Sequence, residues 1–165
     1  MIERTLVLLK PDAVRRGLIG RILSRFEDAG YKIVGAKMVW VDKNICKEHY
    51  ERIGKVISRR GKKVFNNLVK FMTIGPVLAL CIEGVNAVEN IRKMAGPTEP
   101  KSAMPGTIRG DFSHVSFSYA DKKNKAIENV VHVSSSLDEA RQEIALWFKP
   151  SELHSYKTVH EIHTL

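Results

Sequence analysis

Short apolar runs alternate with amphipathic stretches along most of the chain. Four of these runs are rich in valine, leucine and isoleucine and are bounded by proline, glycine or charged residues, a pattern that predicts β-strands. The predicted strands are residues 4–9, 31–41, 77–83 and 126–133. Gly35 interrupts the second strand and predicts a bulge there.

Between the strands, apolar residues recur at the three- and four-residue spacing of a helix that buries one face. The helices predicted in this way are residues 17–30, 42–57 with a break near Gly54, 64–72, 86–95 and 137–148. Asn86 with Glu89, and Ser136 with Glu139, have the spacing of an N-terminal capping box. The basic stretch 58–63 is interpreted as a solvated loop, a likelier role for it than a nucleic-acid patch.

The last predicted helix has a buried stripe and a polar side. Its expected core residues are Leu137, Ala140, Ile144, Trp147 and Phe148. Glu143 falls beside this stripe, on the side that holds Ser136 and Glu139, and its spacing alone suggests a solvated position.

The order of strands and helices predicts an α+β fold. Its expected form is a ferredoxin-like, four-stranded antiparallel sheet with helices packed on it. The length of 165 residues favours a single domain over residues 1–165. No periodicity is clear between residues 97 and 125, so a long irregular loop is expected there, and such loops are usually functional or disordered.

Composition narrows the compartment and the partners. Lysine and arginine number 27 against 18 acidic residues, which gives a net charge of +9 and favours an anionic partner: nucleotide, nucleic acid or acidic membrane. The two cysteines, Cys46 and Cys81, have no zinc or disulfide spacing and suit a reducing cytosol. No apolar run is long enough to span a bilayer, and the N-terminus does not resemble a signal peptide.

The candidate chemistry is dispersed along the chain. Glycine-rich nucleotide motifs of the P-loop and dinucleotide-binding types are absent. Lys10 follows one apolar strand, and His132 lies at the end of another, just before a helix start. An imidazole beside a helix start can meet an anion there. Arg92, Thr98 and Arg109 could clamp phosphates. Taken alone, Thr98 and Arg109 are explained equally well by ordinary loop polarity, and Arg92 by a cation that complements the C-terminus of its helix. Together these residues suggest phosphoryl transfer.

Several motifs resemble those of the nucleoside diphosphate kinase family. They are KPDAV, EHY, RKMAGPTEP, PGTIRGDF, NVVH and EIALWFKPSEL, in the family's order between Arg4 and about Tyr156. RKMAGPTEP and the longer segments at 54–63 and 113–125 look most like those of archaeal members. The resemblance implies a kinase that moves the γ-phosphate of a nucleoside triphosphate to a nucleoside diphosphate by a ping-pong reaction, with Mg²⁺ bridging the phosphates.

The resemblance also implies a role for individual residues. His132 matches the phosphorylated nucleophile, and Glu143 matches the carboxylate that orients it. Lys10 and Tyr50 match residues near the transferred phosphate. The remaining nucleotide-binding positions are Arg92, Thr98 and Arg109 for the other phosphates, Asn129 for the ribose and Val64 for the base.

The chain departs from the family's pattern at several places. Val64 stands where the family usually has a base-stacking phenylalanine, so weaker nucleotide binding is expected. Val133 replaces a glycine after His132, and Ser135 replaces an aspartate. Residues 54–63 and 113–125 are longer than usual, and the second of these segments is expected to be a surface excursion.

The resemblance further implies a homo-oligomer, most often a hexamer, in the cytoplasm. The alternative function is a nucleic-acid-binding or interaction protein on the same fold with reduced catalysis. The charge of +9 and the departures around His132 favour that alternative, whereas retention of every expected phosphate ligand favours the kinase.

Overall fold

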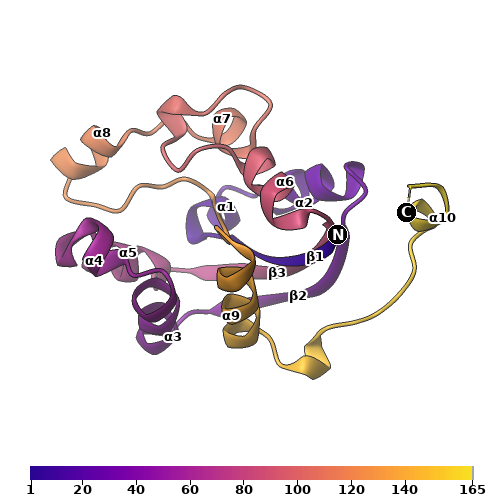
Figure 1. Ribbon diagram of the computed structural model, residues 1–165. Coiled ribbons are helices and arrows are strands. Elements are labelled where there is room, and N and C mark those ends of the chain that lie inside the picture. The colour runs from indigo at the N-terminus through magenta and orange to yellow at the C-terminus, as the bar shows by residue number, and fades with distance from the viewer. Residues whose placement is uncertain (165) are drawn as a thin grey trace.

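The computed structural model describes residues 1–164, with no account of the side chains of His160 and Thr164. Figure 1 shows a sheet with helices on both faces. The elements in chain order are β1 (Ile2–Leu9), α1 (Pro11–Arg15), α2 (Ile19–Asp28), β2 (Lys32–Trp40), α3 (Lys43–Lys47), η1 (Glu48–Ile53), α4 (Val56–Arg60), α5 (Lys62–Met72), β3 (Pro76–Val85), α6 (Ala87–Ala95), η2 (Pro100–Ser102), α7 (Ile108–Phe112), α8 (Phe117–Lys122), β4 (Val131–Val133), α9 (Leu137–Trp147), η3 (Pro150–Glu152) and α10 (Val159–Thr164).

The sheet has the order β2-β3-β1-β4, and every neighbouring pair is antiparallel. The predicted ferredoxin-like α+β fold is therefore confirmed. The register between β2 and β3 shifts between Ile33 and Gly35, which is the bulge predicted at Gly35. None of the helices within residues 1–164 is both long enough and apolar enough to cross a bilayer.

The two faces of the sheet carry separate apolar clusters, because alternate residues of a strand point to opposite faces. Val7 and Leu9 of β1 pack beneath α2, α6 and α7. Leu6 and Leu8 lie on the other face, against η1, α5 and α9. His132 of β4 pairs with Leu8, so its side chain lies on this second face.

The segment after α3 widens into a π-helix, η1, in which the Gly54 N–H donates to the carbonyl of His49 at 3.0 Å. Such single wide turns are rare and occur frequently at functional sites. This one turns both His49 and Tyr50 into the protein, where they are 1% and 6% exposed.

The fourth strand is shorter than predicted. Only Val131–Val133 pairs with β1, whereas the sequence pattern had predicted residues 126–133. The reason is a tight turn centred on Val130, whose φ of +60° is incompatible with strand geometry.

The two longer segments contain helices that the sequence did not predict. Residues 56–60 form α4 and not a loop, and Lys62 already begins α5. Residues 97–125 are not wholly irregular, because they contain η2, α7 and α8. Helices of three to six residues are too short to leave a detectable period in the sequence.

The capping box at Asn86 is absent. Asn86 has a φ of +47° and its side chain makes no capping hydrogen bond to α6. The carboxylate of Glu3 on β1 instead accepts from the N–H of Val88 at 3.1 Å. The capping pattern at Ser136 is confirmed, since its hydroxyl accepts from the Glu139 N–H at 3.2 Å.

Helix α9 is rotated relative to the expected stripe. Ala140, Trp147 and Phe148 are buried as predicted, and Ile144 is half-buried. Leu137 is exposed, however, and Glu143 is only 2% exposed. The polar partners of Glu143 compensate its burial, and they belong to the site described below.

Glu3→Ala is expected to destabilise the protein by about 1 kcal/mol, because it removes the acceptor at the start of α6. Asn86→Gly is the matched control and should change the free energy of unfolding by only a few tenths of a kcal/mol, since glycine adopts a positive φ readily. Urea unfolding of both variants measures this. A larger loss from Asn86→Gly than from Glu3→Ala would contradict the assignment of the cap to Glu3.

Candidate active site

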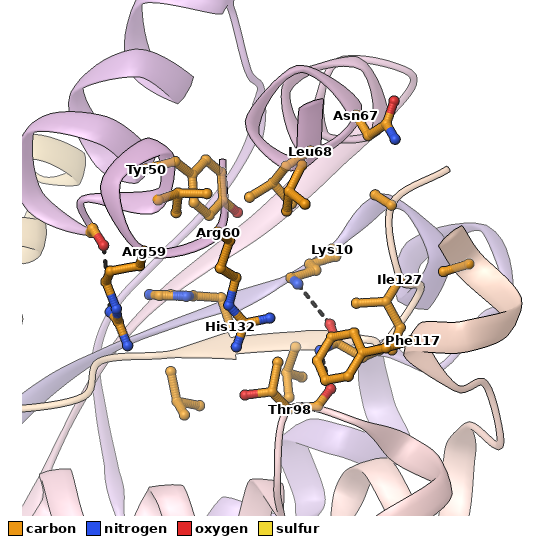
Figure 2. Close-up of a pocket in the computed structure, with 18 of the residues that line it drawn as sticks. Lys10, Tyr50, Arg59, Arg60, Asn67, Leu68, Thr98, Phe117, Ile127 and His132 are labelled. Atoms are coloured by element: carbon orange, nitrogen blue, oxygen red, sulfur yellow. Dashed lines mark hydrogen bonds between the residues drawn. The ribbon is translucent and has the colours of Figure 1, made fainter. Parts of the chain in front are cut away.

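One cavity of about 760 Å³ lies between the β4 end of the sheet, η1 with α4 and α5, and the segment from the end of α6 to α8. All nine residues predicted for the site line it: Lys10, Tyr50, Val64, Arg92, Thr98, Arg109, Asn129, His132 and Glu143. Figure 2 shows Lys10, Tyr50, Thr98 and His132 around this space. The structure therefore brings together residues that are dispersed over 134 positions of the sequence.

The entry to β4 is a strained turn that aims His132. The carbonyl of Asn129 accepts from the N–H of Val131 at 2.7 Å, and Val130 between them has a φ of +60°. For a β-branched residue this backbone is a true outlier, which persists only when its surroundings enforce it. The Asp12 carboxylate accepts from the Val130 N–H at 3.0 Å, and the Lys10 N–H donates to the Val130 carbonyl at 2.9 Å.

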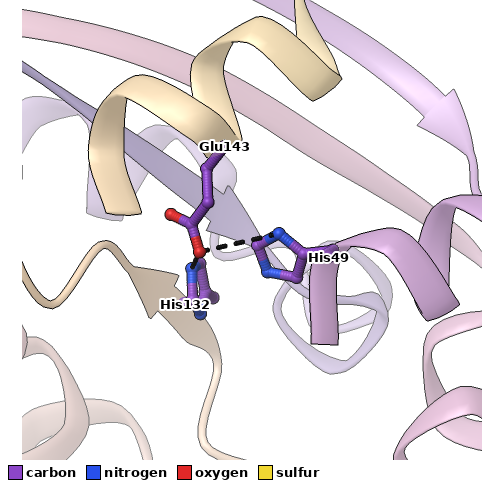
Figure 3. Close-up of side chains that lie close together, drawn as sticks. All are labelled: His49, His132 and Glu143. Atoms are coloured by element: carbon purple, nitrogen blue, oxygen red, sulfur yellow. Dashed lines mark hydrogen bonds and ion pairs between the residues drawn. The ribbon is translucent and has the colours of Figure 1, made fainter. Parts of the chain in front are cut away.

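His132 and Glu143 form a close pair. The Nε2 of His132 lies 2.9 Å from Oε1 of Glu143, and the two side chains are 20% and 2% exposed. An ionised carboxylate can only accept, so Nε2 carries the proton of the neutral imidazole. The lone pair is then on Nδ1, on the side of the ring away from Glu143 (Figure 3). This tautomer makes Nδ1 the nucleophilic nitrogen.

Glu143 remains ionised because its neighbours outweigh its burial. Burial alone would raise the pKa of this carboxyl, but attraction to the His132 ring when that ring is protonated, the hydrogen bond from His132 and a hydrogen bond from Ser134 lower it to about 2. The Ser134 hydroxyl donates to Oε2 at 2.6 Å and accepts from the N–H of Leu6 at 3.2 Å. The serine cluster after β4 thus contributes a buried residue that fixes the carboxylate to β1.

His49 supports the pair from behind as a neutral ring. Its ring centre lies 4.5 Å from that of His132, and its Nδ1 accepts from the Trp147 indole N–H at 3.2 Å. Burial, followed by the nearby His132, lowers the pKa of His49 to about 3. The 3.6 Å contact between its Nδ1 and Glu143, drawn in Figure 3, is therefore no ion pair.

Lys10 is a buried cation at the end of β1. Its Nζ donates to Oδ1 of Asn129 at 2.7 Å, and the residue is 6% exposed. Burial, with repulsion from Arg109, lowers its pKa to about 8. A cation held at this cost is poised to interact with an anion that enters the cavity.

Arg109 joins the loop after α6 to the turn before β4. Its guanidinium donates to the carbonyls of Gly96 at 2.5 Å, Asn129 at 3.3 Å and Val131 at 2.8 Å. Burial, followed by repulsion from Arg92, lowers its pKa to about 10. Three of its five N–H groups are used in this way, which leaves two for a ligand.

A short turn of helix, α7, presents Arg109 to the cavity. Thr107 caps it by accepting from the Gly110 N–H at 3.0 Å. A Cβ on Gly110 would lie 2.0 Å from the carbonyl oxygen of Met104, so only glycine fits there. Local packing therefore explains the glycine in the motif PGTIRGDF.

Two of the unusual residues beside His132 fit the structure without disturbing it. Val133 is buried opposite Val7 in the first apolar cluster, although it also lines the edge of the cavity. Ser135 binds the Glu139 carboxylate through its N–H and its hydroxyl at the start of α9. Neither residue breaks the contact between His132 and Glu143.

Several residues that line the cavity were not predicted for the site from the sequence. Arg59, Arg60 and Lys63 line the cavity, although the sequence favoured a solvated loop for them, and Phe117 lines it from the expected surface excursion. Within residues 1–164, none of the three cations has an acidic partner within 4.0 Å. The density of cations at 59–63 was the only sequence signal for them.

The carboxylates of the cavity are poorly placed to hold a metal ion by themselves. Ligand atoms of His49, His132 and Glu143 lie within 4.8 Å of one another, but Trp147, Ser134 and the pair itself already engage them. The other cavity acids are Glu139, bound to Ser135, and Asp121 on α8. The cationic groups around His132 instead fit phosphate oxygens that arrive with their own divalent ion.

Comparisons with known proteins agree with this geometry. A family model described as nucleoside diphosphate kinase matches residues 3–153. A nucleoside diphosphate kinase of Pyrococcus furiosus is 50% identical over 155 residues, which cover 94% of this chain and 88% of that protein.

Two solved structures extend the likeness to the fold. A transition-state mimic of the Borrelia burgdorferi enzyme with vanadate and ADP has a TM-score of 0.94 at 47% identity, over 97% of this chain and 95% of that one. A Halobacterium salinarum enzyme in complex with CDP has a TM-score of 0.83 at 38% identity, over 98% and 97% of the two chains.

Lys10→Met is expected to stabilise the ligand-free protein by about 1–3 kcal/mol at pH 7, because it removes a buried charge. The pKa of Lys10 is lowered from 10.5 to about 8, so the unfolded chain holds a proton that the folded chain has released between these values. Wild-type stability should therefore gain from this group as pH rises from about 8 to 10.5, and the variant should lack that gain.

Urea unfolding at pH 7 and pH 10 measures both effects. Lys63→Met, which removes an exposed cation of the same cavity, is the matched control and should leave the pH dependence unchanged. A Lys10→Met protein that is less stable at pH 7 and keeps the wild-type pH dependence would show that Lys10 is not held at a cost.

Proposed function

The chain belongs to the nucleoside diphosphate kinase family and transfers the γ-phosphate of a nucleoside triphosphate to a nucleoside diphosphate, and we propose that it does so through a phosphohistidine at His132. The observation that carries the assignment is the hydrogen bond from Nε2 of His132 to Glu143, which leaves the lone pair on Nδ1. The vanadate and ADP held by the Borrelia burgdorferi relative support a phosphoryl-transfer site in the same fold.

The proposed reaction has two mirrored steps. The Nδ1 lone pair attacks the γ-phosphorus, a P–N bond forms, and the P–O bond to the β-phosphate breaks so that the diphosphate leaves. The Nε2 proton stays in place, and the carboxylate of Glu143 stabilises the positive charge that the ring gains. A second nucleoside diphosphate then attacks the phosphohistidine by the reverse path.

Cations surround the place where the phosphate charge accumulates. We assign Lys10 and Tyr50 to the transferred phosphate, because Lys10 is buried beside Asn129 and the hydroxyl of Tyr50 is buried without a partner among the described residues. The remaining N–H groups of Arg109, with Arg92 and Thr98, are assigned to the other phosphates. Asn129 is assigned to the ribose, and Val64 to the base at the mouth.

A divalent ion, Mg²⁺ in our proposal, would come bound to the phosphates. Bound there, it would neutralise charge on the phosphate oxygens, while Lys10 and Arg109 would hold the phosphates from the protein side. The geometry favours this arrangement, because Glu143 and Glu139 already accept hydrogen bonds from His132 and Ser135. Lys10 and Arg109 meet the phosphate oxygens that the ion leaves free.

We also propose a homo-oligomer, with a hexamer as the favoured form, in the cytoplasm. Edge strand β2 exposes Met38 and Trp40, at 56% and 68%, which supports a contact between subunits. Residues 1–165 are treated as one domain with 54–63 and 113–125 as its longer segments. Nucleic-acid binding on this fold is the weaker alternative, because Arg59, Arg60 and Lys63 line the same cavity as His132 and Lys10.

Incubation with γ-labelled ATP should give a phosphoprotein that is stable in base and labile in acid, and that passes its label to added diphosphate. His132→Ala should abolish the labelling, because the acceptor nitrogen of His49, the other imidazole that lines the cavity, is already engaged by Trp147 and that ring is 1% exposed. His49→Gln is a useful comparison, since His49 is neutral and buried behind His132. Labelling that persists in His132→Ala would disprove the assignment of the nucleophile.

Glu143→Gln should slow phosphorylation of His132 by about 100-fold, because it removes the charge that orients and stabilises the ring. Nucleotide affinity should change little, since Glu143 faces His132 and Ser134 and not the phosphates. Rapid-quench labelling and equilibrium binding separate the two effects. Asp138→Asn, at an exposed acid of the same helix, is the control and should behave as wild type; an equal loss in both variants would contradict the role of Glu143.

A further inference from the structure

The two longer segments of the chain meet at the mouth of the cavity. Arg60 ends α4 and Phe117 begins α8, and both line the cavity. The central carbon of the Arg60 guanidinium lies 5.1 Å from the centre of the Phe117 ring, within cation–π distance. Figure 2 shows both side chains pointing into the space in front of Lys10 and Thr98.

The backbone of Phe117 is fixed relative to the phosphate-binding groups. Its N–H donates to the carboxylate of Glu99 at 2.8 Å, and Glu99 directly follows Thr98. The Val115 carbonyl accepts from the N–H of Lys101 at 3.1 Å. The Ser116 hydroxyl caps α8 by accepting from the Tyr119 N–H at 3.2 Å. Phe117 therefore occupies a defined place at the rim and is not a loose surface residue.

Apolar side chains line two sides of the mouth, and the space between them suits a flat apolar group. Val64 and Leu68 of α5 form one side, and Ala126 and Ile127 lie on the segment that leads to β4. The rings of His49 and Tyr50 lie 4.5 and 6.3 Å from His132, so they belong to the phosphate end. Phe117 contacts Arg60 instead and offers an aromatic face at the mouth.

A nucleotide with its γ-phosphate at Nδ1 of His132 must extend its base toward this mouth, because Lys10, Arg109 and Asn129 occupy the inner end. We propose that Phe117, from the segment 113–125, stacks on the base and makes the site favour purine over pyrimidine nucleotides. A purine overlaps a phenyl ring more extensively than a pyrimidine does, which gives the larger stacking free energy. This assignment rests on the proposed function, since it takes the phosphate end from the phosphohistidine reaction.

In this arrangement the guanidinium of Arg60 has two uses. In the ligand-free protein it covers the apolar face of Phe117, and it also lies near enough to Lys10 to contribute to lowering the pKa of that residue. When a base displaces the Arg60 guanidinium from the ring, the guanidinium can move to the phosphates. The negative charge of the phosphates then offsets its repulsion with Lys10.

The test compares Phe117→Ala and Phe117→Leu, which remove the aromatic face, with Phe117→Trp, which keeps it. Leucine retains an apolar side chain of similar reach, so it separates stacking from the loss of packing. Tyr119→Ala is the matched control, because Tyr119 is an aromatic residue of the same helix that is 49% exposed and does not line the cavity. Calorimetric binding of ADP, CDP and inorganic tripolyphosphate measures affinity with a purine, a pyrimidine and no base.

We expect Phe117→Ala and Phe117→Leu to weaken ADP binding by roughly 5- to 100-fold, CDP binding less, and tripolyphosphate binding not at all. Phe117→Trp should preserve the preference for ADP, and Tyr119→Ala should match wild type. Unchanged ADP affinity in Phe117→Leu, or an equal loss for ADP and tripolyphosphate, would overturn the proposal. Labelling of wild-type His132 by ATP is measured in parallel, so failure of the phosphohistidine reaction is distinguished from failure of base stacking.

Discussion

The carboxylate of Glu143 places a full negative charge, 2% exposed, between β4, η1 and α9. An unpaired charge at such a position would cost several kcal/mol, so its partners are obligatory. Ser134 and His132 supply them, and each lies on or beside the strand that pairs with β1. The same two bonds hold α9 against the sheet, fix the tautomer of His132 and expose Nδ1 to the cavity. Stability of this layer and reactivity of the imidazole therefore have one physical origin.

Positive charge is concentrated on the other side of His132, and the nearby Asp12 offsets only part of it. Lys10 and Arg109 are both 6% exposed, and burial lowers the pKa of each, with repulsion from Arg109 adding to the effect at Lys10 and repulsion from Arg92 at Arg109. The ligand-free protein bears this cost, whereas a polyphosphate that enters the cavity relieves it. Because the cations are already held by Asn129 and by three backbone carbonyls, binding requires little reorganisation of them. The strained φ of Val130 belongs to the same network, since Asp12 and Lys10 hold both polar groups of its backbone.

The sequence predicted the features that depend on local pattern or on specific motifs. Continuous apolar runs predicted the four strands in outline, and their ends predicted where Lys10 and His132 would lie. The burial of Glu143 could not be predicted from helical periodicity, because its position is set by a partner eleven residues earlier on a different element. The shortness of β4 follows from the backbone of Val130, whose residue type gives no warning of a positive φ. Helices α4 and α8 are single turns that depend on tertiary contacts, so no period in the sequence marks them.

Residues of the segments 54–63 and 113–125 meet at the mouth of the cavity. Arg60 and Phe117 contact each other, and the hydrogen bonds that anchor Phe117 run to the loop after Thr98 and not to β4. Residues that touch only the base contribute equally to the ground state and the transition state, so they alter affinity and base preference while the chemical step keeps its rate. Residues around Nδ1 of His132 cannot vary in this way, since a small displacement there changes the rate of the chemical step. The mouth of the cavity can therefore vary more freely in sequence than the groups around His132, Glu143 and Lys10.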